Sequence, residues 1–142
     1  MTKRISILGS TGSIGQNALK VIEHLGDGFE VKYLSAARSS EVLIEQARKF
    51  QPATVALIDL SAAEEVKEAL SGSGVEVLSG REGLLELASR DDVDVVLNGL
   101  VGSAGMEPTI RALEAGVDVA LSNKESLVMA GELIENIKKD TG

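Results

Sequence analysis

The chain has 142 residues and a formal net charge of −8, and 44% of its residues are hydrophobic. This length suits one domain, residues 1–142, with a sizeable core. The acidic balance argues against a nucleic acid or an acidic membrane as a partner, because both need a basic surface. The sequence holds no cysteine, which excludes disulfides, thiolate nucleophiles and cysteine metal sites. It has neither a signal-peptide core nor an apolar run long enough for a bilayer, so we expect a cytoplasmic protein.

The first predicted strand leads into a glycine-rich turn. The apolar run Arg4–Leu8 is short enough for a buried strand, and Gly9–Gly15 follows with the spacing G-x-x-G-x-x-G. A strand, a glycine turn and a helix start form a dinucleotide-binding turn, in which unpaired amides hold the diphosphate. Gly9 would allow the tight turn, Gly12 the close approach of the diphosphate, and Gly15 helix–strand packing. A merely structural turn is the alternative, because glycines also close ordinary loops.

The helix after this turn is predicted from apolar residues at helical spacing, and it ends before the glycine-containing turn at 26–28. We expect these apolar residues to form the side of the helix that faces the core. They are Ile14, Ala18, Val21, Ile22 and Leu25.

The second predicted strand, residues 29–35, ends in a segment that bears on the choice of cofactor. Proteins that bind NAD place an acidic residue about 20 positions after the glycine turn, where it holds the ribose 2′-hydroxyl. Here no acidic residue occurs between this strand and Glu41. Arg38 offers a guanidinium to a 2′-phosphate, and Ser39 and Ser40 offer further donors. The segment favours NADP(H) over NAD(H), and the alternative is an exposed loop arginine beside a serine helix cap.

Helices and strands continue to alternate along the chain. This pattern predicts an α/β fold with a doubly wound, mostly parallel sheet of the Rossmann type. Ser61 and Glu64 match a capping box at the start of the third helix, whose acidic residues read as a solvated face rather than a metal site. The remaining helices are expected at 40–50, 61–70, 80–89, 106–115 and 122–139, and the remaining strands at 54–58, 75–78, 94–98 and 117–121.

A glycine-rich loop, residues 99–105, follows the predicted strand at 94–98. In open α/β sheets, ligands bind at the carboxyl ends of the strands. Gly99 and Gly102 would let the nicotinamide half of a cofactor lie close to the backbone. A glycine-rich connection with no ligand is the alternative.

The segment Ser122–Glu125 begins the last predicted helix. It fits a second capping box, which accounts for its first and last residues. Lys124 is not explained in this way, because a cation in the first turn faces the positive end of the helix dipole. With Asn123 it would sit at the carboxyl end of a strand. We therefore interpret Lys124 as a functional residue that polarises a substrate oxygen or pairs with a substrate anion.

Three segments resemble the 1-deoxy-D-xylulose 5-phosphate reductoisomerase family: Gly9–Gly15, Gly102–Gly105 and Ala120–Val128. The resemblance runs along the whole chain, and Asn-Lys-Glu-Ser-Leu-Val at 123–128 is its most distinctive part. It implies an enzyme that rearranges 1-deoxy-D-xylulose 5-phosphate and reduces it with NADPH to 2-C-methyl-D-erythritol 4-phosphate, in non-mevalonate isoprenoid biosynthesis. It also implies a divalent metal, magnesium or manganese, and a homodimer.

The same resemblance implies roles for individual residues. Lys124 would contact the substrate, while Asn123 and Glu125 would border the nicotinamide. The match at 37–39 is partial, because relatives often carry Gly-Lys-Asn there. The residues implied to bind the cofactor are Thr11, Gly12, Ser13, Ile14, Ala37, Arg38, Ser39, Asn123 and Glu125, and the catalytic one is Lys124.

One departure from the family concerns the metal. The family's metal-binding carboxylates lie in an Asp-Ser-Glu segment beyond the last predicted helix, and no such segment occurs up to Gly142. We therefore expect no metal ligands in this chain, no catalytic or C-terminal domain, and binding of NADPH without turnover. Two other functions stay open, namely another NADP-dependent Rossmann oxidoreductase and a non-catalytic domain that senses a nucleotide or coenzyme A.

Overall fold

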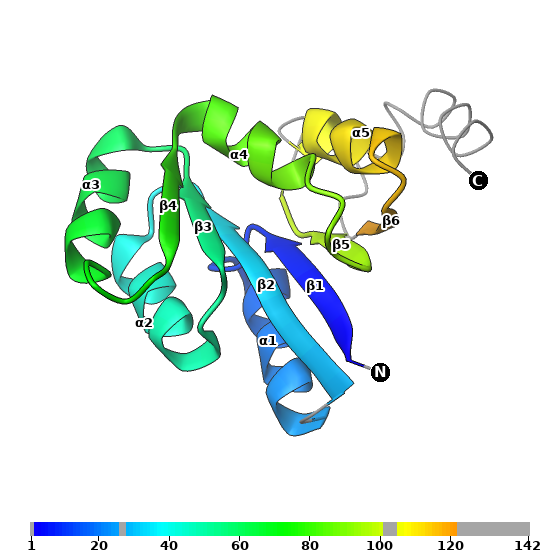
Figure 1. Cartoon of the computed structure of the whole chain (residues 1–142), viewed down its shortest axis with the longest axis horizontal. Helices are drawn as coiled ribbons and strands as arrows, with labels where there is room; N and C mark the ends of the chain where they lie inside the picture. The colour runs from blue at the N-terminus through cyan, green and yellow to red at the C-terminus, as the bar shows by residue number, and fades with distance from the viewer. Residues whose placement is uncertain (1, 26–27, 101–104, 122–142) are drawn as a thin grey trace.

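In the computed structural model, one sheet of parallel strands lies between two layers of helices (Figure 1). The structure describes residues 2–25, 28–100 and 105–121. Within these residues the sheet has six strands in the order β4-β3-β2-β1-β5-β6, and no helix is long and apolar enough to cross a bilayer. In chain order the elements are β1 (Lys3–Leu8), α1 (Ser13–Leu25), β2 (Phe29–Ala36), α2 (Ser40–Phe50), β3 (Thr54–Leu57), α3 (Leu60–Ala69), β4 (Glu76–Ser79), α4 (Gly80–Ala88), β5 (Val95–Asn98), α5 (Met106–Glu114) and β6 (Asp118–Leu121).

The sheet is wound in two directions from β1. This strand pairs in parallel with β2 on one side and with β5 on the other. The chain first runs outward through β2, β3 and β4, with α1, α2 and α3 on one face (Figure 1). It then crosses back through α4 to β5 and β6, with α4 and α5 on the other face. The doubly wound parallel fold is therefore confirmed, and its winding reverses between β1 and β5, where such sheets bind ligands.

Aliphatic residues on both faces of the sheet attach the helices. Ile7 of β1 is completely buried in one cluster with Leu43 of α2. Its neighbour Leu8 is completely buried in a second cluster with Leu84 of α4. Successive residues of a strand point to opposite faces, so β1 contributes to both clusters and is covered on both sides.

The core-facing side of α1 is only in part the predicted one, because Ile22 is buried and Ala18 packs against the core, but the other three predicted residues are exposed. Ile14, Val21 and Leu25 are 38%, 56% and 55% exposed. The helix is turned by the close approach of Gly15 to the preceding loop, where an added Cβ would lie 2.4 Å from the Gly9 carbonyl oxygen. Residues four and seven positions after Gly15 share its face. The buried residues are therefore Gly15, Leu19 and Ile22.

The capping box predicted for α3 is also wrong. The N-cap is Asp59, whose Oδ1 accepts hydrogen bonds from the N–H groups of Ser61 and Ala62 at 2.9 and 3.1 Å. Aspartate caps a helix as well as serine does, and Asp59 stands immediately before the first helical residue. The helix predicted after the glycine turn begins within that turn, at Ser13, and all other predicted elements up to residue 121 lie within one residue of the observed bounds. The helix predicted at 122–139 lies outside the described residues.

Candidate functional site

The glycine-rich turn connects the carboxyl end of β1 to α1. Gly9 opens it with a φ of +76°, in the left-handed region that suits glycine. The Gly12 N–H donates to the Gly9 carbonyl at 3.2 Å, and the Gln16 N–H donates to the Gly12 carbonyl at 2.9 Å as the helix begins. The turn is therefore tight and internally bonded, and it lies at the edge of the sheet where the winding reverses.

The three glycines of the turn have different surroundings. A Cβ on Gly9 would lie 3.2 Å from the backbone carbon of Gly99, and one on Gly15 would lie 2.4 Å from the Gly9 carbonyl oxygen. A Cβ on Gly12 would make only an ordinary contact with that oxygen, at 3.6 Å. The packing of the chain thus requires glycine at 9 and 15, whereas Gly12 is exposed and has room for a Cβ.

Several backbone amides of the turn have no acceptor among the described residues. In the hydrogen bonds between described residues, the N–H groups of Thr11, Ser13 and Ile14 donate to no acceptor. Ser13 is the first residue of α1, so the last two amides lie at the positive end of the helix dipole. Such a group of free donors suits an anion of the phosphate type.

The segment after β2 lies next to the turn. The Ser10 N–H donates to the Ser35 carbonyl at 2.8 Å, and the Gly9 N–H donates to the Ser35 hydroxyl at 3.1 Å. Residues 37–39 follow one position after the end of β2 and are exposed. The structure therefore brings two of the predicted segments, 9–15 and 37–39, to the same edge of the sheet.

The side chains before α2 differ in what they contact. Ser39 occupies the N-cap position, but its side chain makes no capping hydrogen bond. The Ser40 hydroxyl donates to the Glu65 carboxylate at 2.8 Å. Within the described part of the chain, the exposed Arg38 side chain has no ion pair. Arg38 and Ser39 are therefore open to a ligand, whereas the Ser40 hydroxyl is already engaged.

Asn98, the last residue of β5, is a buried polar residue that the sequence reasoning did not single out. Its Nδ2 donates to the Gly105 carbonyl at 2.8 Å and to Thr109 Oγ1 at 2.6 Å, and its Oδ1 accepts from the Leu100 N–H at 3.0 Å. These bonds tie both ends of the loop after β5 to the start of α5. An amide that ends an otherwise apolar strand is the signal that could have identified it.

The remaining predicted residues lie outside the described part of the chain. These are Gly102 in the loop after β5, and Asn123, Lys124 and Glu125 after β6. The strand before the last three pairs Leu121 with Asn98. Among the described residues, no three histidine, aspartate or glutamate side chains are grouped so that they could hold a metal ion.

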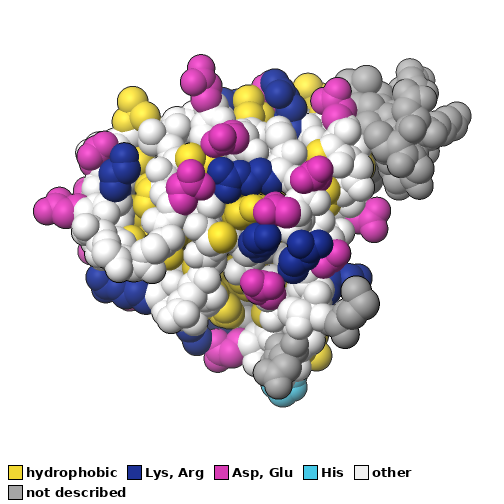
Figure 2. All heavy atoms as spheres, viewed as in Figure 1, with side chains coloured by type: hydrophobic (Ala, Val, Ile, Leu, Met, Phe, Trp, Pro, Cys, Tyr) yellow, Lys and Arg dark blue, Asp and Glu magenta, His cyan; other side chains and the backbone are white. Residues whose placement is uncertain are grey.

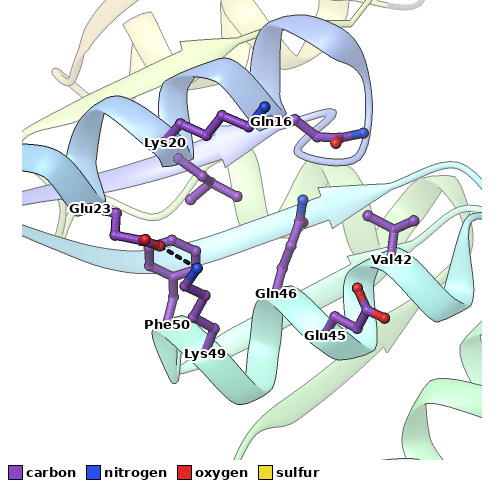
Figure 3. A pocket seen from close by; sticks show the side chains of 9 residues that line it. Gln16, Lys20, Glu23, Val42, Glu45, Gln46, Lys49 and Phe50 are labelled. Carbon is purple, nitrogen blue, oxygen red and sulfur yellow. Dashed lines mark ion pairs between the residues drawn. The ribbon is translucent and has the colours of Figure 1, made fainter.

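A cavity of about 310 Å³ lies between α1 and α2 (Figure 3). Lys49 of α2 and Glu23 of α1 form an ion pair at this cavity, and Gln46 points from α2 toward α1. The walls of the cavity carry acidic, basic and apolar side chains together. This mixture does not indicate a particular class of ligand. The lining residues are Gln16, Leu19, Lys20, Glu23, Val42, Glu45, Gln46, Lys49 and Phe50.

Acidic and basic side chains are interspersed on the face of the molecule drawn in Figure 2. Pairs such as Lys32 with Asp92, at 3.0 Å, and Arg90 with Glu76, at 3.1 Å, join opposite charges. On this face the described basic side chains are thus interspersed with acidic ones rather than gathered into one patch.

Comparison with known proteins identifies the family of the chain. The family model for 1-deoxy-D-xylulose 5-phosphate reductoisomerase matches residues 5–131. The chain belongs to the 1-deoxy-D-xylulose 5-phosphate reductoisomerase family. A reductoisomerase from Chloroherpeton thalassium is 46% identical over 140 residues, which are 99% of this chain and 36% of that relative.

Solved reductoisomerases have the same fold over this region. The enzyme from Zymomonas mobilis, in complex with NADPH, has a TM-score of 0.94 and 36% identity, and the match covers 100% of this chain and 37% of that one. A reductoisomerase in complex with NADPH, fosmidomycin and magnesium has a TM-score of 0.93 and 34% identity, covering 99% and 35%. The chain thus spans little more than a third of the length of these reductoisomerases.

Proposed function

We propose that the chain is the NADPH-binding domain of a 1-deoxy-D-xylulose 5-phosphate reductoisomerase. One observation carries the proposal. Beside the reversal of the sheet, a Cβ on Gly12 would meet only one ordinary contact, and the described residues supply no acceptor for the N–H groups of Ser13 and Ile14. A dinucleotide needs both, because its diphosphate must approach the backbone closely and accept hydrogen bonds from it. The NADPH complex of the Zymomonas mobilis relative supports this choice of ligand.

Each exposed segment has a role in this proposal. Residues 11–14 bind the diphosphate through backbone amides and hydroxyl groups. Residues 37–39 bind the 2′-phosphate, and the Arg38 guanidinium forms a two-point contact with its oxygens. Asn123 and Glu125 border the nicotinamide, and Lys124 contacts the substrate. In these assignments the chain binds the reductant NADPH and orients its nicotinamide toward the substrate.

The proposal extends to the reaction of the whole protein. The whole protein rearranges 1-deoxy-D-xylulose 5-phosphate and reduces the product with NADPH to 2-C-methyl-D-erythritol 4-phosphate. It does so in the cytoplasm and as a homodimer. Magnesium or manganese would supply Lewis-acid polarisation of the substrate's carbonyl and hydroxyl oxygens. The magnesium and fosmidomycin in a related structure support this part. The metal ligands are assigned to no described residue of this chain.

The role of Arg38 provides the test. Arg38→Ala is expected to weaken NADPH binding by about tenfold or more, because a charge-assisted bond to the 2′-phosphate is lost. Binding of NADH, which lacks that phosphate, is expected to stay unchanged. Calorimetric titration of both cofactors measures the two affinities, with coenzyme A as a third ligand.

The matched control is Arg111→Ala, which removes an exposed arginine from α5 on the other face of the sheet. It should leave all affinities unchanged. Similar affinities of the unsubstituted chain for NADPH, NADH and coenzyme A would contradict the proposal and favour a general nucleotide-binding domain.

A further inference from the structure

Gln46 is a polar residue of α2 that is buried against the glycine turn. It is only 8% exposed, and it forms part of the wall of the cavity between α1 and α2 (Figure 3). Its Nε2 donates to the Ser10 carbonyl at 2.9 Å, and its Oε1 accepts from the Ser10 hydroxyl at 2.8 Å. Ser10 is completely buried. The oxygen and the nitrogen of the Gln46 side-chain amide therefore both form hydrogen bonds to one residue of the turn.

The first of these bonds fixes the direction of a backbone amide. No peptide bond among the described residues is cis, so the Thr11 N–H points away from the Ser10 carbonyl within the same planar unit. Because that carbonyl is directed at Gln46, the Thr11 N–H is directed away from α2. It is also one of the amides for which the described residues supply no acceptor.

We propose that Gln46 is a positioning residue, which holds the Thr11 amide in the direction that binds the diphosphate of the cofactor. This inference rests on the proposed function. Gln46 acts through Ser10 and does not touch the cofactor itself. The diphosphate is common to NADP and NAD, whereas only NADP carries the 2′-phosphate opposite Arg38. Gln46 therefore sets the affinity for both cofactors, and Arg38 sets the difference between them.

A purely structural role for Gln46 would have a different consequence. Loss of its amide would remove the Gln46 partner of the buried Ser10 carbonyl and leave the Ser10 hydroxyl only its 3.2 Å bond to the Ser35 carbonyl, which destabilises the folded chain. Molecules that remained folded would then bind cofactor as before. The experiment must therefore measure affinity in the folded protein as well as stability.

The first test is Gln46→Met, which keeps the length and burial of the side chain and removes both hydrogen bonds. In the folded variant, the Kd values for NADP⁺ and NAD⁺ are expected to rise by the same factor, about tenfold. The control is Glu45→Met, at an exposed neighbour that lines the same cavity, and it should leave both Kd values unchanged. Unchanged Kd values in folded Gln46→Met, or an altered ratio between the two cofactors, would overturn the inference.

A second variant, Gln46→Glu, gives a readout that does not depend on the stability of the methionine variant. Its carboxylate has no proton to donate to the Ser10 carbonyl, whereas the protonated acid does. Burial raises the pKa of a carboxyl group, so protonation is expected within the range in which the chain is folded. The affinity for NADP⁺, relative to the unsubstituted chain at the same pH, should therefore recover as the pH is lowered toward about 5. The absence of any recovery would count against the inference.

The two proposals fail in different ways. If the unsubstituted chain binds neither NADP⁺ nor NAD⁺, the proposed function is wrong and this inference falls with it. If the unsubstituted chain binds cofactor and folded Gln46→Met binds it equally well, only the inference about Gln46 is wrong.

Discussion

Gly12 and Gly15 differ in what a single added methyl group would meet. At Gly15 it would lie 2.4 Å from the Gly9 carbonyl oxygen and 2.5 Å from Ser10 Cα, both backbone atoms. At Gly12 it would find ordinary contact, on the side that we assign to the diphosphate. A substitution at Gly15 is therefore a test of folding, and a substitution at Gly12 is a test of binding.

We expect Gly12→Ala to keep or slightly raise the stability of the chain, by up to about 1 kcal/mol, because alanine restricts the unfolded state. The same variant should weaken NADPH binding by about tenfold or more, since the methyl group occupies the space of the diphosphate. Gly15→Ala should instead lower the unfolding free energy by about 2 kcal/mol or more. Urea unfolding and cofactor titration measure the two effects, and a Gly12→Ala variant that binds NADPH normally would contradict the assignment.

The parts of the site that could be predicted from the sequence are those that are local in the chain. The glycine spacing, the strand before it and the arginine after β2 each occupy a few neighbouring positions. Gln46 and Asn98 could not be assigned in this way. Gln46 contacts a residue 36 positions earlier, and Asn98 contacts Gly105 and Thr109, which are 7 and 11 positions further along the chain. Their partners are set by tertiary packing, which residue spacing alone does not encode.

At the scale of elements, the alternation of strands and helices was predictable, and the rotation of a helix about its axis was not. Of the predicted apolar stripe of α1, Ile22 and Ala18 pack in the core, whereas Ile14, Val21 and Leu25 lie beside the buried stripe and are exposed. What decides the rotation is the contact between Gly15 and the turn, and this contact demands the absence of a side chain. A hydrophobicity pattern counts side chains, so it gives no weight to a glycine that packs closely.

The start of α3 offers a test between the predicted and the observed cap. Asp59→Ala should lower the unfolding free energy by about 1 kcal/mol, because the amides of Ser61 and Ala62 lose their acceptor. Ser61→Ala is the matched control and should change stability by less than about 0.5 kcal/mol, since the observed cap does not use its hydroxyl. Chemical unfolding of both variants measures the difference. A larger loss in Ser61→Ala than in Asp59→Ala would restore the capping box.

At the scale of the whole molecule, the amino-terminal edge of the sheet carries a polar cluster opposite the candidate site. The Tyr33 hydroxyl donates to both carboxylate oxygens of Asp92 at 2.7 Å, and the Arg90 guanidinium lies 5.1 Å from the centre of the Tyr33 ring. Arg90 also donates to Thr54 Oγ1 at 2.9 Å and to Glu76 at 3.1 Å. The cluster joins the start of β3 and β4 to β2 and to the loop before β5, so it contributes to stability rather than to binding.

The protonation of this cluster links stability to pH. The hydrogen bond from Thr54, and then that from Arg90, lowers the pKa of Glu76. Burial acts to raise the pKa of Asp92, but the hydrogen bond from Tyr33 is among the contacts that outweigh it, so this pKa is also lowered. Burial, followed by the hydrogen bond to Asp92, raises the pKa of Tyr33. A carboxyl group with a lowered pKa stabilises the fold above its unfolded pKa, and a tyrosine with a raised pKa does so below its unfolded pKa.

The melting temperature should therefore be highest between about pH 5 and about pH 9, and it should fall on both sides. On the acid side the loss follows protonation of Glu76 and Asp92, and on the alkaline side it follows ionisation of Tyr33.

Asp92→Asn should lower the melting temperature at neutral pH and weaken its dependence on acid, so that the curves of the variant and the unsubstituted chain converge near about pH 3. Asp91→Asn, at an exposed neighbouring carboxylate outside the cluster, is the control. Thermal unfolding followed by circular dichroism gives both curves, and an Asp92→Asn curve that ran parallel to the unsubstituted one would show that the contacts of Asp92 with Tyr33 and Lys32 do not couple folding to protonation.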